Sequence, residues 1–322
     1  MKVLLTGATG FVGAPLLRSL QANPTLTVRA ALRRPAEPGS LEADWQAVGE
    51  ISAQTDWRSA LAGIDVVIHL AARVHVMRDE ASDPLQSFLR VNTDATLHLA
   101  RQAVAAGVRR LVFLSSVKVN GEQTLAGRPF RADDAALPED AYAISKHRAE
   151  LGLREIAQAT GLEVVIIRPP LVYGPGAKAN FAALVDAVAR GIPLPLGGIH
   201  NNLRSLVGID NLVDLVTTCI THPQAANQTF LVSDGEDVST ADLVRRLARA
   251  MDRPARLLPV PAWALKAGAA ALGRSAAAQR LCGNLQVDIT STRERLGWTP
   301  PLGLDEGLRQ ALAKARAGAG AA

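Results

Sequence analysis

Two hydroxyl groups and one amine in this chain have the types and spacing of a proton-transfer site. Tyr142 and Lys146 are four residues apart, so on a helix they share one face. A lysine cation within about 4–6 Å lowers a tyrosine pKa by roughly 1–3 units, which makes the phenol a usable proton donor and acceptor. Ser116 ends an apolar run and can hydrogen-bond a reacting oxygen. We interpret the three as a catalytic set, the alternatives being a surface pair and a turn cap.

A glycine-rich turn at the start of the chain could hold a pyrophosphate. Gly7, Gly10 and Gly13 lie between an apolar run at 2–6 and a helical pattern at 13–21. Glycines there allow a tight turn and a close approach of the anion to the helix N-terminus. We therefore predict a dinucleotide site, with the contacting residues Gly7, Thr9, Gly10, Phe11, Val12 and Gly13.

The end of the second apolar run bears on which dinucleotide is bound. Arg33 and Arg34 follow residues 27–32, and no carboxylate appears before Glu37. An acidic residue here usually contacts the ribose 2′-hydroxyl of NAD, whereas arginine suits the 2′-phosphate of NADP. We expect NADP(H) in preference to NAD(H), with Arg33 as the contact. The alternative is that both arginines are solvated loop residues.

The elements that must position these groups alternate along the chain. Strand-like runs are expected at 2–6, 27–32, 47–51, 65–70, 110–115, 163–168 and 228–232, with helical patterns at 13–21, 56–62, 84–106 and 140–160. This alternation is typical of an α/β fold, a doubly wound parallel-sheet Rossmann domain. We assign residues 1–173 to it, with a return at about 205–235. Residues 174–204 and 236–322 should form a smaller, mostly helical substrate-binding lobe.

Composition narrows the functional classes. The net charge is +5, but the arginines are scattered in short clusters, which suits an anionic small ligand better than nucleic acid. Two isolated cysteines favour a reducing compartment, no residue spacing suits a metal, and no apolar run is long enough to span a bilayer. We expect a cytoplasmic protein. The Ala-rich stretch 261–278 is expected to be a core-packed helix rather than one lying on a membrane surface.

The motifs together resemble the extended short-chain dehydrogenase/reductases, in the branch of UDP-glucose 4-epimerase. The resemblance runs from the glycine loop through His69-Leu-Ala-Ala72, Ser115-Ser116 and Arg168-Pro-Pro-Leu-Val-Tyr-Gly-Pro-Gly176 to Leu296-Gly-Trp298. Asn120 stands where the family usually has tyrosine. The resemblance implies that Tyr142 and Lys146 are catalytic, that Ser116 is the third member, and that Asn92 supports Lys146.

The resemblance also implies ligand contacts. For the cofactor these are Glu50 and Ile51 at the adenine, Leu70, Ala71 and Ala72 along it, Asn92, and Pro169 near the nicotinamide. For a UDP-linked substrate they are Asn180, Phe181, Leu194, Leu196 and Arg204. For Glu50, Phe181 and Leu194, ordinary core or loop packing is an open alternative.

Among reactions, we expect NADPH-dependent reduction of a UDP-4-keto-6-deoxy-N-acetylhexosamine in bacterial surface-polysaccharide synthesis, because Arg33 favours an exchangeable reductant. The alternatives are an NAD-dependent UDP-hexose 4-epimerase, a reductase of another ketone, and a cofactor-sensing regulator. Nucleic-acid binding ranks last. Analogy to the family suggests a homodimer packed through helices 84–106 and 140–160.

Overall fold

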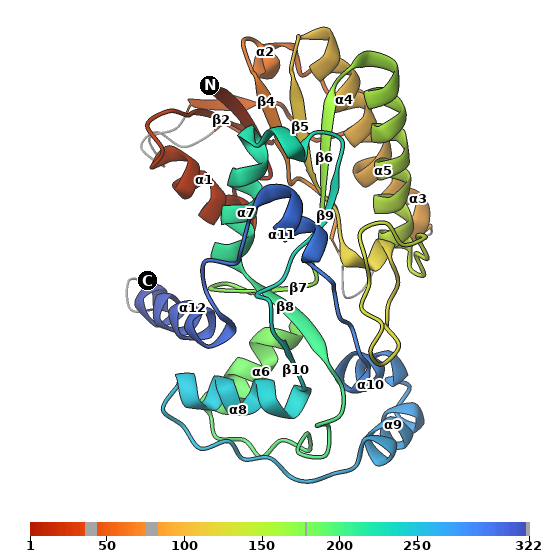
Figure 1. The fold of residues 1–322 in the computed structure, drawn as a ribbon, viewed down its shortest axis with the longest axis vertical. Coiled ribbons are helices and arrows are strands. Elements are labelled where there is room, and N and C mark those ends of the chain that lie inside the picture. Colours follow the sequence, from red (N-terminus) through yellow and green to blue (C-terminus); the bar gives the residue numbers. More distant parts are fainter. Residues whose placement is uncertain (36–43, 75–82, 178, 320–322) are drawn as a thin grey trace.

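The computed structural model describes residues 1–35, 44–74, 83–177 and 179–319. Its centre is a parallel sheet of seven strands in the order β3-β2-β1-β4-β5-β6-β9 (Figure 1). The confirmed doubly wound arrangement follows from strands that are apolar on both sides and so need helices on both faces. The strands are β1 (Lys2–Thr6), β2 (Thr27–Leu32), β3 (Asp44–Ala47), β4 (Val66–His69), β5 (Arg110–Leu114), β6 (Glu163–Arg168) and β9 (Thr229–Leu231).

Each face of the sheet has its own apolar core. Helices α1 (Gly13–Gln21) and α7 (Ile209–Thr221) cover one face, where their leucines and valines pack on alternate residues of β1, β2 and β4. Helices α2 (Arg58–Leu61), α4 (Ala95–Ala105) and α5 (Ala141–Thr160) cover the other. The sheet is therefore packed between two layers of helices, which fix the positions of its strand ends.

The expected long helix at 84–106 is interrupted. It begins as α3 (Pro84–Phe88), continues through one π-helical stretch (Leu89–Asp94) and becomes α4. The side chain of Asp83 accepts a hydrogen bond from the Gln86 N–H and so caps the first turn. A π-helical stretch within an α-helix often marks a functional site, and this one packs against α5.

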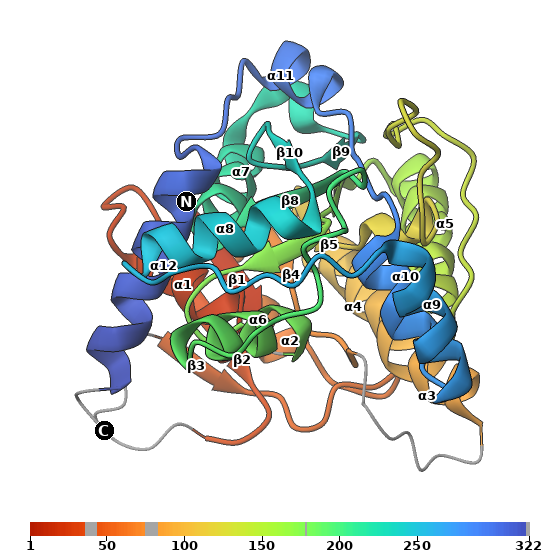
Figure 2. The same cartoon turned by 90° about the horizontal axis from the view of Figure 1, so that it is seen from below.

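The smaller lobe contains a sheet as well as helices. Strands β7 (Leu171–Tyr173), β8 (Arg204–Gly208) and β10 (Asp237–Val238) form a three-stranded sheet in the order β10-β8-β7. Seen from below, the lobe spreads beneath the large sheet (Figure 2). Its helices are α6 (Ala179–Ala189), α8 (Thr240–Ala250), α9 (Ala262–Ala271), α10 (Ser275–Cys282) and α12 (Leu304–Ala319).

Near its end the chain returns to the large sheet. Helix α11 (Thr290–Leu296) packs against β9, and Leu296 and Trp298 join the core of the α1 and α7 layer. The Trp298 indole donates to Asp214 of α7 at 2.7 Å. Within the described ranges, no helix has the length and hydropathy needed to cross a bilayer.

Candidate active site

The glycine turn forms a cradle that side chains would fill. Gly7 has φ +70°, the left-handed region that glycine tolerates best. A Cβ on Gly7 would lie 2.8 Å from the Ala71 nitrogen, and a Cβ on Gly13 would lie 2.0 Å from the Gly7 oxygen. No side chain caps the start of α1 at Val12. Bare backbone N–H groups at a helix N-terminus fit the pyrophosphate of a dinucleotide.

The same edge of the sheet brings the end of β4 to this cradle. The Thr6 hydroxyl accepts a hydrogen bond from the Ala71 N–H at 3.2 Å and pairs with His69 Nδ1 at 2.7 Å. His69 Nε2 pairs with the Thr96 hydroxyl at 2.9 Å. Burial lowers the His69 pKa to about 3, and the nearby Lys146 acts in the same direction. His69 is therefore a neutral, buried side chain that links β1 to α4 beside the glycine turn.

Helix α5 begins beside Ser115 and Ser116, which we call the serine segment, and it carries Tyr142 and Lys146 on one face. Asp140 caps the helix, because its carboxylate accepts from the Ala143 N–H at 2.7 Å. Tyr142 and Lys146 then lie one turn apart, and Tyr142 is near enough to the Ser116 hydroxyl for that group to act on its pKa. The Lys146 amine donates to the Leu114 carbonyl at 2.8 Å and lies 4.4 Å from the centre of the Phe113 ring. The three residues singled out by the sequence are thus gathered at the carboxyl edge of β5.

The pKa of Tyr142 differs from the expectation. Burial raises it to about 12, the charge of Asp140 adds to this, and the hydrogen bond with Ser116 opposes it. Burial lowers the Lys146 pKa to about 7 against the charge of Glu150. We expected the lysine to lower the pKa of the Tyr142 phenol. For the charges of the protein itself that expectation is wrong, because the pKa is raised. A buried amine is only partly charged at neutral pH and gives the phenolate little support.

A cluster of charged side chains lies next to the start of the Tyr142 helix. The Lys118 amine donates to Glu122 and to Asp140, each at 2.6 Å. Its backbone N–H donates to the Ser116 hydroxyl oxygen at 3.2 Å. Lys118 therefore joins the serine segment to the cap of the catalytic helix and partly neutralises the carboxylate that raises the Tyr142 pKa.

Beneath the site lies a buried ion pair that sequence reasoning missed. Glu150, two turns beyond Tyr142 on α5, accepts from the Arg168 Nε at 2.9 Å and from the Ser115 hydroxyl at 2.6 Å. Arg168 also donates to Asn120, the residue found where the family has tyrosine, at 3.0 Å. The pair ties α5, β5 and β6 together. The i, i+4, i+8 spacing of Tyr142, Lys146 and Glu150 was the available signal.

The remaining cofactor candidates occupy different surroundings. Asn92 hydrogen-bonds Ser145 and the backbone of Arg73, so its contact is with the neighbour of Lys146. Arg33 is exposed at the end of β2. Leu70, Ala72 and Ile51 are half-buried, Glu50 is exposed, and Pro169 is buried, with its carbonyl accepting from the Val117 N–H.

The substrate candidates lie in the smaller lobe. Phe181 is buried against Tyr173 and Leu196 packs in the same core, while the backbone of Leu194 pairs with Arg256 and Leu258. Arg204 donates to the Gly283 carbonyl at 3.1 Å, and burial lowers its pKa against the charge of Glu122. Asn180 lies in α6, but its side chain is outside the described part of the structure.

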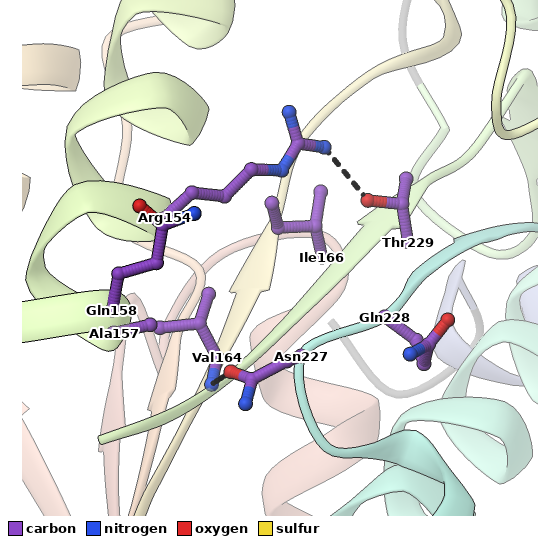
Figure 3. A pocket seen from close by; sticks show the side chains of 8 residues that line it. All are labelled: Arg154, Ala157, Gln158, Val164, Ile166, Asn227, Gln228 and Thr229. Carbon is purple, nitrogen blue, oxygen red and sulfur yellow. Dashed lines mark hydrogen bonds between the residues drawn. The ribbon is translucent and has the colours of Figure 1, made fainter. Parts of the chain in front are cut away.

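Figure 3 shows a separate pocket, whose lining includes none of the candidate site residues. It is formed by the carboxyl half of α5, the start of β6 and the 227–229 segment, where Arg154 donates to the Thr229 hydroxyl at 2.9 Å. The Asn227 side chain there accepts from the Val164 N–H. Val164 is at the amino end of β6, whereas ligands of open parallel sheets bind at the carboxyl ends. We therefore place the active site elsewhere.

The chain is similar to known sugar-nucleotide enzymes over nearly its whole length. A UDP-glucose 4-epimerase of Vibrio cholerae is 52% identical over 310 residues, which cover 96% of this chain and 93% of the relative. A crystal structure of a UDP-glucuronic acid 4-epimerase from Bacillus cereus with NAD superposes with a TM-score of 0.78 at 21% identity, covering 98% and 99% of the two chains. MoeE5 in complex with UDP-glucose and NAD gives a TM-score of 0.75 at 25% identity, covering 99% and 100%.

These comparisons overturn the expected reaction. We expected NADPH-dependent reduction of a 4-keto sugar, yet the 52% identical relative is an epimerase, and solved structures of similar fold are 4-epimerases. The expectation depended on Arg33. An exposed arginine at a strand end does not determine whether a cofactor is exchanged or retained, which is the physical difference between the two reactions.

Residues 3–233, which include the glycine turn, the serine segment and the Tyr142 helix, match the family described as "NAD dependent epimerase/dehydratase family". This match covers well over half of the chain. From the match and the 52% identical relative, the chain belongs to the NAD dependent epimerase/dehydratase family.

Proposed function

We propose that this protein is a UDP-hexose 4-epimerase that retains a nicotinamide dinucleotide. The observation that carries the proposal is the gathering of Ser116, Tyr142 and Lys146 at the sheet edge that also bears the glycine cradle. The 52% identical epimerase supports the reaction type. Epimerisation oxidises and re-reduces one carbon, so it needs one acid/base group that works in both directions.

The side chains of the site divide this work. Ser116 orients the 4-oxygen of the sugar, and Tyr142 takes its proton and later returns it. A bound nicotinamide dinucleotide supplies the acceptor and donor of the hydride. Lys146, held by the Leu114 carbonyl, hydrogen-bonds the cofactor ribose and increases the acidity of Tyr142 whenever it is protonated. The glycine turn and Asn92 would bind the dinucleotide and fix its position.

On the substrate side, we propose that the uridine diphosphate binds along the smaller lobe. Arg204 is the cation for the diphosphate, because it is half-buried and has one hydrogen bond to a carbonyl rather than a bidentate carboxylate partner among the described residues. Asn180, Phe181, Leu194 and Leu196 complete this wall in the proposal. In the proposal the cofactor side consists of residues 1–173 with 205–235 and the substrate side of 174–204 with 236–322, although β7 and β8 pair in the small sheet with β10 of the substrate side.

The form of the cofactor is part of the proposal. Retention through both half-reactions favours NAD, whereas Arg33 would favour NADP. Denaturing the purified protein and identifying the released nucleotide by chromatography distinguishes the two. An Arg33→Ala variant that changes the affinities for NAD and NADP equally would remove the case for a phosphate contact.

The epimerase proposal is tested by incubating the protein with UDP-galactose and no added reductant. UDP-glucose formation is followed with a coupling dehydrogenase. Tyr142→Phe should lower kcat by roughly 10²–10⁴-fold and leave the bound nucleotide in place. Tyr173→Phe is the matched control, since Tyr173 is the other of the two tyrosines and donates to Asp234 in the core of the smaller lobe. Near-normal turnover by Tyr142→Phe would refute the assigned role.

We further propose a cytoplasmic homodimer. Both cysteines are free, which supports a reducing compartment. Helices 84–106 and 140–160 would form the dimer contact, and Leu151 on α5 is 45% exposed there. Leu151→Asp should shift the sedimentation coefficient to that of a monomer. A wild-type protein that sediments as a monomer at micromolar concentration would contradict the dimer.

A further inference from the structure

The segment around α9 differs from the rest of the surface. The expectation of a core-packed helix is wrong, because α9 contains no buried residue. Three large apolar side chains in and beside it are exposed, namely Leu258 at 49%, Trp263 at 73% and Leu272 at 75%. The segment lies at the end of the smaller lobe farthest from the large sheet (Figure 1). An exposed apolar surface of this kind marks an interaction site.

The exposed residues of α9 form one stripe. Leu265 packs toward the core of the smaller lobe. Trp263, Ala267 and Ala270 are spaced by four and three residues and are exposed, so they lie together on the face turned away from Leu265. The helix is held by Leu265 and by its packing against α10, which leaves the stripe available to a partner.

The charge of this segment is of one sign. No Asp or Glu lies between Asp252 and Asp288, whereas five Lys and Arg do. The other 30 Lys and Arg of the chain are matched by 30 Asp and Glu, so these five equal the whole net charge of +5. All five are exposed, and the ion pairs of the described residues do not include any of them. They are Arg253, Arg256, Lys266, Arg274 and Arg280.

We propose that residues 253–282 are a docking surface for an anionic lipid bilayer. Trp263 and Leu272 enter the headgroup region, and the surrounding cations bind the lipid phosphates. Trp263 is on the exposed face of α9 and Leu272 is exposed at its C-terminal end; together with the Lys and Arg of the segment, they give the helix the chemistry of an interfacial helix. A second copy of the chain is a poor occupant, because the contact would bring two sets of unpaired cations together.

The test measures binding to lipid vesicles by flotation. Wild-type protein should partition onto vesicles that contain phosphatidylglycerol and not onto pure phosphatidylcholine, and added salt should weaken the binding. Trp263→Ser with Leu272→Ser should lower the partition constant on the order of tenfold or more. Lys266→Ser with Arg274→Ser should lower it by about fivefold for each cation removed.

A matched control uses another exposed leucine. Leu137 is 67% exposed and lies outside residues 253–282, with its N–H bonded to the Val119 carbonyl, so Leu137→Ser should bind vesicles as wild type does. Circular dichroism confirms that each variant is folded, and the loss of fluorescence change in Trp263→Phe on adding vesicles reports insertion of this one side chain. Three results would overturn the proposal: equal binding to neutral and anionic vesicles, unchanged binding by the α9 variants, or a dimer that Trp263→Ser dissociates.

Discussion

Removing Glu150 should destabilise the protein far more than an ordinary surface change on the same helix. The Glu150 and Arg168 side chains are 0% and 3% exposed and pair through two hydrogen bonds of 2.9 and 2.5 Å. Glu150→Ala leaves the guanidinium with Asn120 as its remaining side-chain partner and leaves the Ser115 hydroxyl without its acceptor.

The magnitude follows from burial of the charge. Breaking one partner of a buried pair costs about 3–5 kcal/mol, because the remaining charge is desolvated and uncompensated. Folded domains have free energies of unfolding of about 5–15 kcal/mol, so this is a large share of the total. Replacing both partners, as in Glu150→Leu with Arg168→Met, removes the uncompensated charge and should recover most of the loss.

The assay is urea denaturation at neutral pH, with unfolding followed by circular dichroism, for the wild type, Glu150→Ala, the single variants Glu150→Leu and Arg168→Met, and the double variant that combines these two. Glu155→Ala is the matched control, because Glu155 is exposed one turn further along α5. It should change the free energy of unfolding by no more than about 0.5 kcal/mol.

The reasoning would be refuted if Glu150→Ala lost no more stability than Glu155→Ala. It would also be refuted if the double variant lost the sum of the two single losses. Either result would mean that Glu150 and Arg168 are not coupled, and that the tie between α5, β5 and β6 has another origin.

Three further predictions concern the same edge of the sheet. Lys118→Ala removes the cation from Asp140, whose charge then raises the Tyr142 pKa further; the Tyr142 limb of the kcat/KM profile should move to higher pH, and Lys118→Arg should leave it in place. Burial lowers the pKa of His69 from 6.5 to about 3, so between these two pH values the unfolded state binds a proton that the folded state does not. The free energy of unfolding should therefore fall as the pH falls, by about 2 kcal/mol between pH 7 and 5. The variant His69→Gln should flatten that fall in denaturation curves, and an unchanged slope would contradict it. Gly13→Ala would place a Cβ 2.0 Å from a loop carbonyl oxygen and should abolish retention of the nucleotide. The exposed Gly303, with open space around it and no positive φ, is the control and should tolerate alanine.

The sequence by itself determined the features that depend on local spacing. The glycine turn is recognisable because close backbone approach admits no side chain, and the Tyr142 and Lys146 pair because helical geometry aligns residues four apart. The alternation of apolar strands and helices determined the sheet and its two layers, since strands buried on both faces need cover on both sides. Family membership followed from the same motifs.

The tertiary structure decided what depends on contacts between distant segments. The pKa of Tyr142 is raised by burial, which no spacing within α5 reveals, and the Glu150 and Arg168 pair joins residues on different elements. The α9 stripe is exposed because the helix contacts the rest of the smaller lobe through Leu265 and α10, on its other side. The burial of a side chain and the partner of a charge depend on residues that are close in space but distant in the sequence. Local spacing along the chain therefore does not reveal them.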